Sequence, residues 1–198
     1  MVFLGRHLSG TAARWAIVML DSVRSDHPLR QLFAGLVENT FCSEVGLCDP
    51  ALTDYIADLL VSFTHVDRLH AIRKAQGRDL SHVAAILVAM SDETPASEAE
   101  RDRRIYREIG DFSLFWAGVY PEHLRQPARR ATDVLVNYVT QGKRSYAIVS
   151  DLVEEDDRPP QSLFKHLSDE FESCLHGLGL VRRELEHQWP ATPGELLI

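Results

Sequence analysis

Apolar residues recur at intervals of three and four along almost the whole chain, which places side chains on one face of an α-helix. The stripes with this spacing are 52–66, 80–90, 105–119, 134–139, 146–152 and 164–178. A further helix is expected at 29–41, begun by Pro28. The pattern predicts an all-α protein, a multi-helix bundle of about six or seven helices.

Proline and glycine mark where these helices begin and end. Pro50 precedes the first of the stripes, Pro121 ends the 105–119 helix, and Gly142 is expected to end the 134–139 helix. One long final helix is expected after Pro159 and Pro160. Only 15–20 and 147–149 look even weakly like strands, and neither has a hairpin partner.

Two polar segments interrupt the apolar stripes. The acidic segment 151–160 is a predicted loop, and the polar segment 91–100 is the one candidate for an internal boundary. We therefore expect a single helical domain over 1–190, with a possible boundary at 91–100, followed by a flexible tail at 191–198.

The charge balance disfavours nucleic acid as a partner. The chain has 29 acidic and 21 basic side chains and a formal net charge of −8. Eight basic and twelve acidic residues precede Glu100, so each half carries −4, and no basic half exists. No apolar run reaches the ~20 residues of a membrane span, and the start of the chain does not resemble a secretory signal.

The three cysteines are too few for a disulfide framework, so a reducing cytoplasm is the expected compartment. Cys42 and Cys48 are separated by five residues, more than is usual in structural zinc sites. Cys174 lies near an apolar face and is expected to be a small core residue. The segment Gly142-Lys143-Arg144-Ser145 resembles the end of a phosphate loop but lacks its upstream glycine and strand, so a helix break and a turn are expected.

Two acid–histidine pairs have the spacing of a di-iron helical bundle, in which both ligands lie on one helix face. They are Glu184 with His187 and Asp67 with His70. At about 100° per residue, Glu184 and His187 point away from the apolar stripe and into water. His70 lies on the apolar side of its helix. We therefore expect no cofactor, with a metal-dependent enzyme using these four residues as an alternative.

Basic residues gather near the 105–119 stripe. They are Arg101, Arg103, Arg104 and Arg107, followed by Arg125, Arg129, Arg130, Lys143 and Arg144. Such a group could bind phosphates or an acidic partner. Acids are interleaved, however, with Arg104–Glu108 and Arg107–Asp111 at i,i+4 spacing. A solvated, ion-paired face is the favoured interpretation, in which Asp111 need not be a buried acid, and a docking protein with an arginine-rich face is the alternative.

The most apolar stretch of the chain is rich in aromatic residues. Phe112 and Trp116 lie on one face of the 105–119 helix, Phe115 widens that face, and Tyr120 follows the helix directly. Gly110 and Gly118 each cost about 1 kcal/mol in a helix interior, which suggests close approach of another helix or a ligand. The alternatives are a central core helix and a pocket wall or oligomer interface, to which Tyr138 and Tyr146 could also contribute.

The same stretch resembles a group of uncharacterised bacterial helical proteins. The residues that carry the resemblance are Gly110-Asp111-Phe112-Ser113-Leu114-Phe115, Gly118, Pro121-Glu122, Leu124, Tyr138, Gly142, Tyr146 and the helix from Phe164 to Phe171. The resemblance covers about residues 105–178 and implies an all-helical bacterial protein. It carries over no catalytic residue.

The sequence favours a cytoplasmic binding protein over an enzyme. The favoured hypothesis is a helical interaction or ligand-binding protein that self-associates through Phe112, Phe115, Trp116 and Tyr120. A homo-oligomer or another protein is the expected partner, because homodimers are the commonest assemblies.

Overall fold

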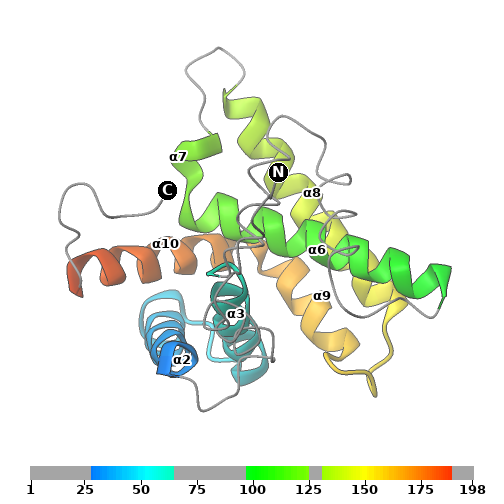
Figure 1. The fold of residues 1–198 in the computed structure, drawn as a ribbon, viewed down its shortest axis with the longest axis horizontal. Helices are drawn as coiled ribbons and strands as arrows, with labels where there is room; N and C mark the ends of the chain where they lie inside the picture. The colour runs from blue at the N-terminus through cyan, green and yellow to red at the C-terminus, as the bar shows by residue number, and fades with distance from the viewer. Residues whose placement is uncertain (1–27, 65–96, 125–130, 189–198) are drawn as a thin grey trace, which may run out of the picture.

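The computed structural model describes residues 28–64, 97–124 and 131–188, and within these ranges every regular element is helical (Figure 1). The elements are α2 (Pro28–Thr40), η1 (Phe41–Val45), α3 (Pro50–Ser62), α6 (Glu98–Val119), α7 (Pro121–Leu124), α8 (Ala131–Leu152), α9 (Gln161–Asp169) and α10 (Phe171–Gln188). The predicted all-α fold is therefore confirmed. None of the described helices is long and apolar enough to cross a membrane.

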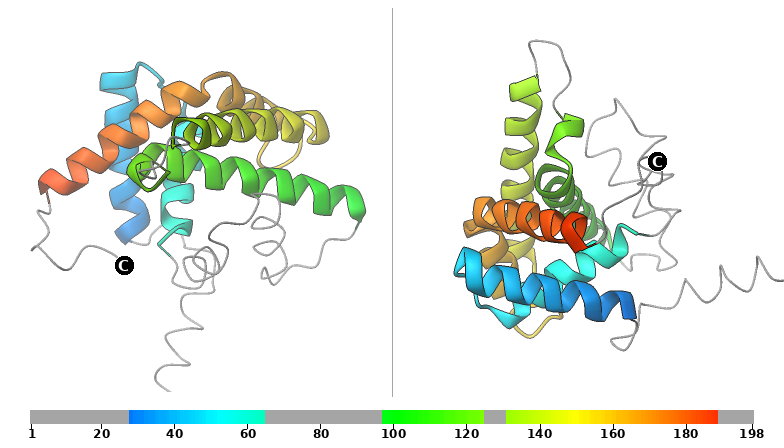
Figure 2. Two further views of the ribbon diagram at one scale, coloured as in Figure 1. Left: turned by 90° about the horizontal axis from the view of Figure 1, so that it is seen from above. Right: turned by 90° about the vertical axis from the view of Figure 1, so that its left-hand side faces the viewer.

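The helices pack into one body around a shared core. α6 lies along α8, and α8 packs against α9, as the two views of Figure 2 show. α2 and α3 form an antiparallel pair, and α10 runs between that pair and α6 (Figure 1). The stripes predicted from sequence supply many of the buried side chains, among them Ile56, Ile109, Leu167 and Leu178.

Several predicted helix ends are confirmed, and their caps explain them. α2 begins at Pro28 and α3 at Pro50. Asp49 caps α3, because its side chain accepts hydrogen bonds from the N–H groups of Ala51 (2.9 Å) and Leu52 (3.4 Å). α6 ends just before Pro121, as expected.

Gly110 and Gly118 lie where another helix approaches closely, as their presence in a helix interior predicted. A Cβ atom on Gly110 would lie 2.6 Å from Cε1 of Tyr146 on α8. A Cβ atom on Gly118 would lie 2.8 Å from Cβ of Leu178 on α10. The glycines therefore allow α6 to contact both neighbours, at the expense of helix propensity.

Gly142 does not end a helix, and this expectation was wrong. α8 continues through it to Leu152, and a Cβ atom at this position would lie 2.5 Å from Cζ of Phe171. The close approach of Phe171, and not the end of a helix, thus explains why this position is a glycine. The phosphate-loop-like segment 142–145 and the strand-like segment 147–149 both lie inside α8.

The expected long final helix is divided in two. α9 ends at Asp169 and α10 begins at Phe171. Glu170 between them starts the new helix: its carbonyl accepts from the N–H of Cys174 (2.8 Å), and its carboxylate accepts from the hydroxyl of Ser173 (2.8 Å). α10 is then continuous to Gln188.

Cys42 and Cys48 form a disulfide, contrary to the expectation from cysteine number. The turn of η1 and Gly46, whose φ is 82°, fold the chain back so that the two Cα atoms lie 4.6 Å apart. Only a glycine adopts such a φ readily. Cys174 is buried and free, as predicted for a small core residue. Burial raises the pKa of its thiol to about 12.

Candidate functional site

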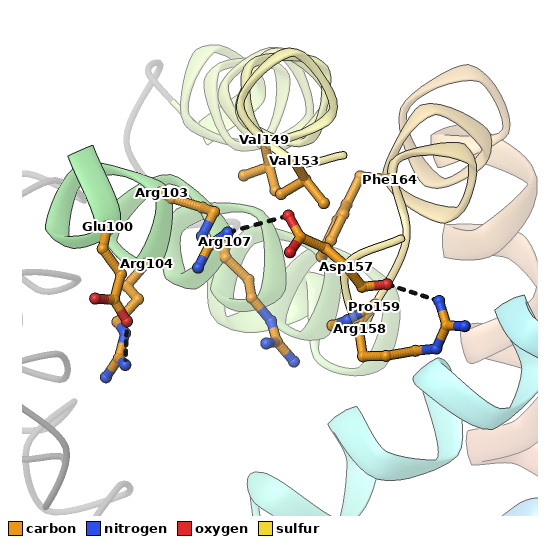
Figure 3. Close-up of a pocket in the computed structure, with 10 residues that line it drawn as sticks. All are labelled: Glu100, Arg103, Arg104, Arg107, Val149, Val153, Asp157, Arg158, Pro159 and Phe164. Atoms are coloured by element: carbon orange, nitrogen blue, oxygen red, sulfur yellow. Dashed lines mark hydrogen bonds and ion pairs between the residues drawn. The ribbon is translucent and has the colours of Figure 1, made fainter. Parts of the chain in front are cut away.

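A cavity of about 210 Å³ opens between the first half of α6, the end of α8, the following loop and α9 (Figure 3). Its lining residues are Glu100, Arg103, Arg104, Arg107, Val149, Val153, Asp157, Arg158, Pro159 and Phe164. Four arginines face two carboxylates, so the lining carries a formal charge of +2. The whole chain carries −8, and the cavity is therefore a local concentration of positive charge.

Residues distant in sequence build the charged side of the cavity. Arg103 of α6 donates from Nη1 to Oδ2 of Asp157, 3.4 Å away. The same carboxylate oxygen accepts from the N–H of Glu154 at 3.0 Å, which fixes the loop after α8. Arg158 donates to the carbonyl oxygen of Asp157 at 2.9 Å. The loop thus closes one side of the cavity through contacts with α6.

Glu100 and Arg104 form a second ion pair at the rim. Arg104 donates from Nη2 to Oε1 of Glu100 at 2.6 Å, one helical turn away on α6. Two of the four lining guanidinium groups, those of Arg103 and Arg104, are therefore hydrogen-bonded to carboxylates of the lining itself.

Arg107 is held from inside the protein by a buried polar cluster. Its Nε donates to the hydroxyl of Tyr55 at 3.1 Å, and its Cζ lies 5.3 Å from the centre of that ring. The Tyr55 hydroxyl in turn donates to Oδ1 of Asp111 at 2.6 Å. The Tyr146 hydroxyl donates to the same oxygen at 2.7 Å. Oδ2 of Asp111 lies 3.8 Å from Nε of Arg107.

The two phenols of the cluster keep their protons at neutral pH. Burial raises the pKa of Tyr55 and that of Tyr146 well above the ordinary value, and the adjacent Asp111 carboxylate raises both further. Both phenols therefore stay protonated and act as donors. Hydrogen bonds from two phenols and the nearby Arg107 guanidinium satisfy the requirement that a buried carboxylate be hydrogen-bonded and paired.

The two Nη atoms of Arg107 have a different environment from Nε, which Tyr55 holds. Its side chain is 44% exposed, and in Figure 3 the guanidinium extends from α6 between Arg104 and Arg158. Among the described residues no hydrogen-bond partner reaches its two Nη atoms. The inner edge of the guanidinium group is thus fixed while its outer edge can donate to a ligand.

The expectation that Asp111 need not be a buried acid was wrong. It does lie on the Arg107 side of α6, as expected, but it is buried, with 6% exposed. Helical projection missed this because Tyr55 of α3 and Tyr146 of α8 cover that side of the helix. Tyr55 was not singled out at all. The sequence did contain a sign of its role. Tyr55 lies three residues after Leu52 and four before Leu59, and a tyrosine on an apolar face needs a partner for its hydroxyl.

The six predicted aromatic site residues fall into two groups. Phe112, Phe115, Trp116, Tyr120 and Tyr138 lie together, and Phe63, the residue that follows α3, stacks on Phe115 with ring centres 4.0 Å apart. Within this group Phe112 and Phe115 are buried, whereas the other three side chains are partly exposed. Tyr146 belongs instead to the buried cluster beneath the cavity.

The alternative metal site has only partial structural description. Glu184 and His187 are exposed on α10, as helical projection predicted, and Glu184 accepts a hydrogen bond from Gln188 (2.8 Å). Asp67 and His70 lie outside the described residues, as do the predicted helix 80–90 and Arg125, Arg129 and Arg130. Within the described ranges no three His, Cys, Asp or Glu side chains are grouped so that they could hold a metal ion.

No family model matches the chain, and no significant match was found among curated proteins or solved structures. The resemblance to bacterial helical proteins therefore stays a prediction.

Proposed function

We propose that this protein binds a small anionic ligand in the arginine-lined cavity, with Arg107 as its anchor. The observation that carries the proposal is the two-sided environment of Arg107. Tyr55 fixes Nε from within, and both Nη atoms are left for a ligand among the described contacts. A guanidinium group presents its Nη donors as a planar fork that suits carboxylate and phosphate oxygens.

Arg107 is suited to anchor a ligand because its side chain is already held in place before the ligand binds. A free arginine side chain loses about 2 kcal/mol of rotamer entropy when it is fixed. Here the hydrogen bond from Nε and the Tyr55 ring already restrict it before any ligand arrives. Less of the interaction energy is then spent on ordering the side chain, which raises affinity.

The chemistry of the lining favours binding over catalysis. The described lining contains no serine, threonine, cysteine, histidine or lysine. Its two carboxylates, those of Glu100 and Asp157, are both hydrogen-bonded to lining arginines. The groups that usually act as nucleophiles or general bases are thus missing or already engaged within this lining.

Titration calorimetry with three probes tests the proposal: inorganic phosphate, phenyl phosphate and benzoate. At least one probe should bind the wild-type protein with one-to-one stoichiometry. Arg107→Lys keeps the charge but loses the fork, and it should weaken binding at least tenfold. Arg101→Lys is the matched control, because Arg101 is exposed on the same helix and does not line the cavity. Failure of all three probes to bind, or equal binding by both variants, would contradict the proposal.

Self-association through the aromatic group is a second candidate function. It is supported by the partial exposure of Trp116, Tyr120 and Tyr138 on adjoining helices. Partly exposed aromatic side chains are common anchors of protein interfaces. The homo-oligomer and the cytoplasmic location expected from sequence stay predictions. Sedimentation of the wild-type protein over a range of concentrations tests the self-association.

A further inference from the structure

We infer that Cys42 and Cys48 form a reversible redox site, at which a dithiol reduces the disulfide by exchange and leaves the helical fold intact. This inference is independent of the anion-binding function and concerns the turn between α2 and α3. Three properties of that turn carry it: the accessibility of Cys48, the short stretch of chain that the disulfide closes, and the non-covalent contacts that hold both ends of the turn.

Cys48 is the more accessible of the two cysteines. It is exposed, whereas Cys42, within η1, is half-buried. Ser43, Glu44 and Gly46 are exposed as well, so the disulfide lies in an exposed turn. Thiol–disulfide exchange requires access to one sulfur of the bond. We therefore place the attack of a reductant at Cys48.

A dithiol completes the exchange in two steps. One thiolate of the reductant attacks Sγ of Cys48, the bond to Sγ of Cys42 breaks, and Cys42 leaves as a thiolate that takes a proton from water. The second thiolate of the reductant then attacks its own sulfur in the mixed disulfide, and Cys48 is released as a thiol. The dithiol loses two electrons and becomes a disulfide, and the two electrons reduce the bond between Cys42 and Cys48.

The disulfide closes only a short stretch of chain. Its cysteines are 6 positions apart, and they lie between two consecutive helices that pack against each other. A cross-link stabilises a fold largely by restricting the unfolded chain, and this effect grows with the length of the closed loop. Opening this disulfide should therefore cost less stability than opening one that joins distant parts of a chain.

The core and two backbone hydrogen bonds hold the start of the turn. Phe41 is fully buried, and a Cβ atom on Gly177 of α10 would lie 2.5 Å from Cε2 of its ring. The carbonyl oxygen of Phe41 accepts from the N–H of Gly46 and from that of Leu47 at 2.9 Å. None of these contacts requires the bond between the two sulfur atoms.

The end of the turn is held by α3 and α9. Asp49 directly follows Cys48 and caps α3, and its Oδ2 lies 2.8 Å from Nδ1 of His166 on α9. Leu52, in the first turn of α3, is fully buried. Reduction should therefore free the exposed residues between these two anchored ends and leave the packing of the helices unchanged.

The third cysteine does not compete for the exchange. Cys174 is buried on α10, and burial raises the pKa of its thiol to about 12. The thiolate is the nucleophile in exchange, and a thiol with so high a pKa stays protonated at neutral pH. Exchange is thus confined to Cys42 and Cys48.

Thiol counting on the native full-length protein tests the inference. After oxidation with oxidised glutathione, no thiol should react with Ellman's reagent. After treatment with dithiothreitol and its removal, two thiols should react, and the third should react only in denaturant. The far-ultraviolet circular dichroism should be unchanged by reduction, and the melting temperature should fall by no more than about 10 °C. Oxidised glutathione should restore the disulfide.

Two single variants test where the attack occurs. Cys42→Ser leaves the exposed thiol of Cys48, and Cys48→Ser leaves the half-buried thiol of Cys42. Ellman's reagent should react about fivefold faster with the first variant, because the rate depends on access to the sulfur. Equal rates, or a faster reaction of Cys42, would overturn the assignment of the attack to Cys48.

The double variant Cys42→Ser/Cys48→Ser separates the role of the disulfide from that of the fold. It should have the circular dichroism of the wild-type protein and no response to dithiothreitol. Three results would overturn the reversible redox site: loss of the helical signal on reduction or in the double variant, a disulfide that dithiothreitol opens only in denaturant, or a disulfide that includes Cys174.

Discussion

Removing the hydroxyl of Tyr55 should weaken both the fold and the ligand site, whereas removing that of Tyr146 should weaken the fold alone. The two phenols donate to the same oxygen of Asp111, at 2.6 Å and 2.7 Å. Only Tyr55 also accepts from Nε of Arg107. Tyr55→Phe and Tyr146→Phe therefore form a matched pair that separates support of Asp111 from support of Arg107.

The structure sets the expected magnitudes. A hydrogen bond to a charged group contributes about 1.5–3 kcal/mol when one partner is left buried. Tyr146→Phe removes one such bond and should lower the free energy of unfolding by about that amount. Tyr55→Phe removes two, but Nε of the half-exposed Arg107 can turn to water. We expect a loss of about 2–4 kcal/mol for Tyr55→Phe, only partly additive because the bonds share one network.

Urea unfolding and calorimetry with phenyl phosphate measure the two effects. Tyr55→Phe should weaken binding about tenfold, since ~1.4 kcal/mol of anchoring corresponds to that factor. Tyr146→Phe should leave the affinity within about threefold of wild type, a change of under 0.7 kcal/mol. Equal loss of affinity in both variants, or none in Tyr55→Phe, would refute the idea that Tyr55 prepares Arg107 for the ligand.

Four other substitutions test the packing, a helix cap and the aromatic group. Gly35→Ala, on an exposed face of α2 with nothing within 4 Å, should raise the free energy of unfolding by about 1 kcal/mol. Gly110→Ala should lower it by about 1–3 kcal/mol, because the Tyr146 ring must move; a stabilising effect would contradict the close contact. Burial raises the pKa of Asp49, but hydrogen bonds from His166 and two N–H groups outweigh it and hold that pKa below its usual value. This carboxylate therefore contributes stability above its unfolded pKa of about 4, and the contribution is lost as pH falls through the lower folded value. Acid unfolding should accordingly be less steep below pH ~4 in Asp49→Asn than in wild type, and identical pH profiles would contradict this. Trp116→Ala should lower the free energy of unfolding by about 3–5 kcal/mol if the side chain belongs to the core, or dissociate an oligomer if it forms an interface. Unchanged stability and unchanged mass by light scattering would exclude both.

The sequence predicted the helical fold well because local rules govern helix formation. The spacing of apolar residues and the positions of prolines identified α2, α3 and α6. They gave the start of α2 at Pro28, the start of α3 at Pro50 and the end of α6 before Pro121. Those rules failed at Gly142 and Glu170. Gly142 is required by the approach of Phe171 from α10, and Glu170, whose carboxylate accepts from the Ser173 hydroxyl, separates α9 from α10. Both depend on contacts that periodicity does not describe.

The site was less predictable for a related reason. The arginines of α6 were recognised, and a phosphate partner was considered, but a solvated face was favoured. What converts that face into a cavity is the loop after α8, whose Asp157 is 54 positions from Arg103. Tyr55 is 52 positions from Arg107. One sequence contains no information on such pairings until the topology of the helices is known.

A crystal structure of the protein with phenyl phosphate tests the central claim most directly. The account predicts phosphate oxygens about 2.7–2.9 Å from both Nη atoms of Arg107, with Nε still bonded to Tyr55. A phosphate bound elsewhere, or an Arg107 side chain that leaves Tyr55 to reach it, would contradict the account.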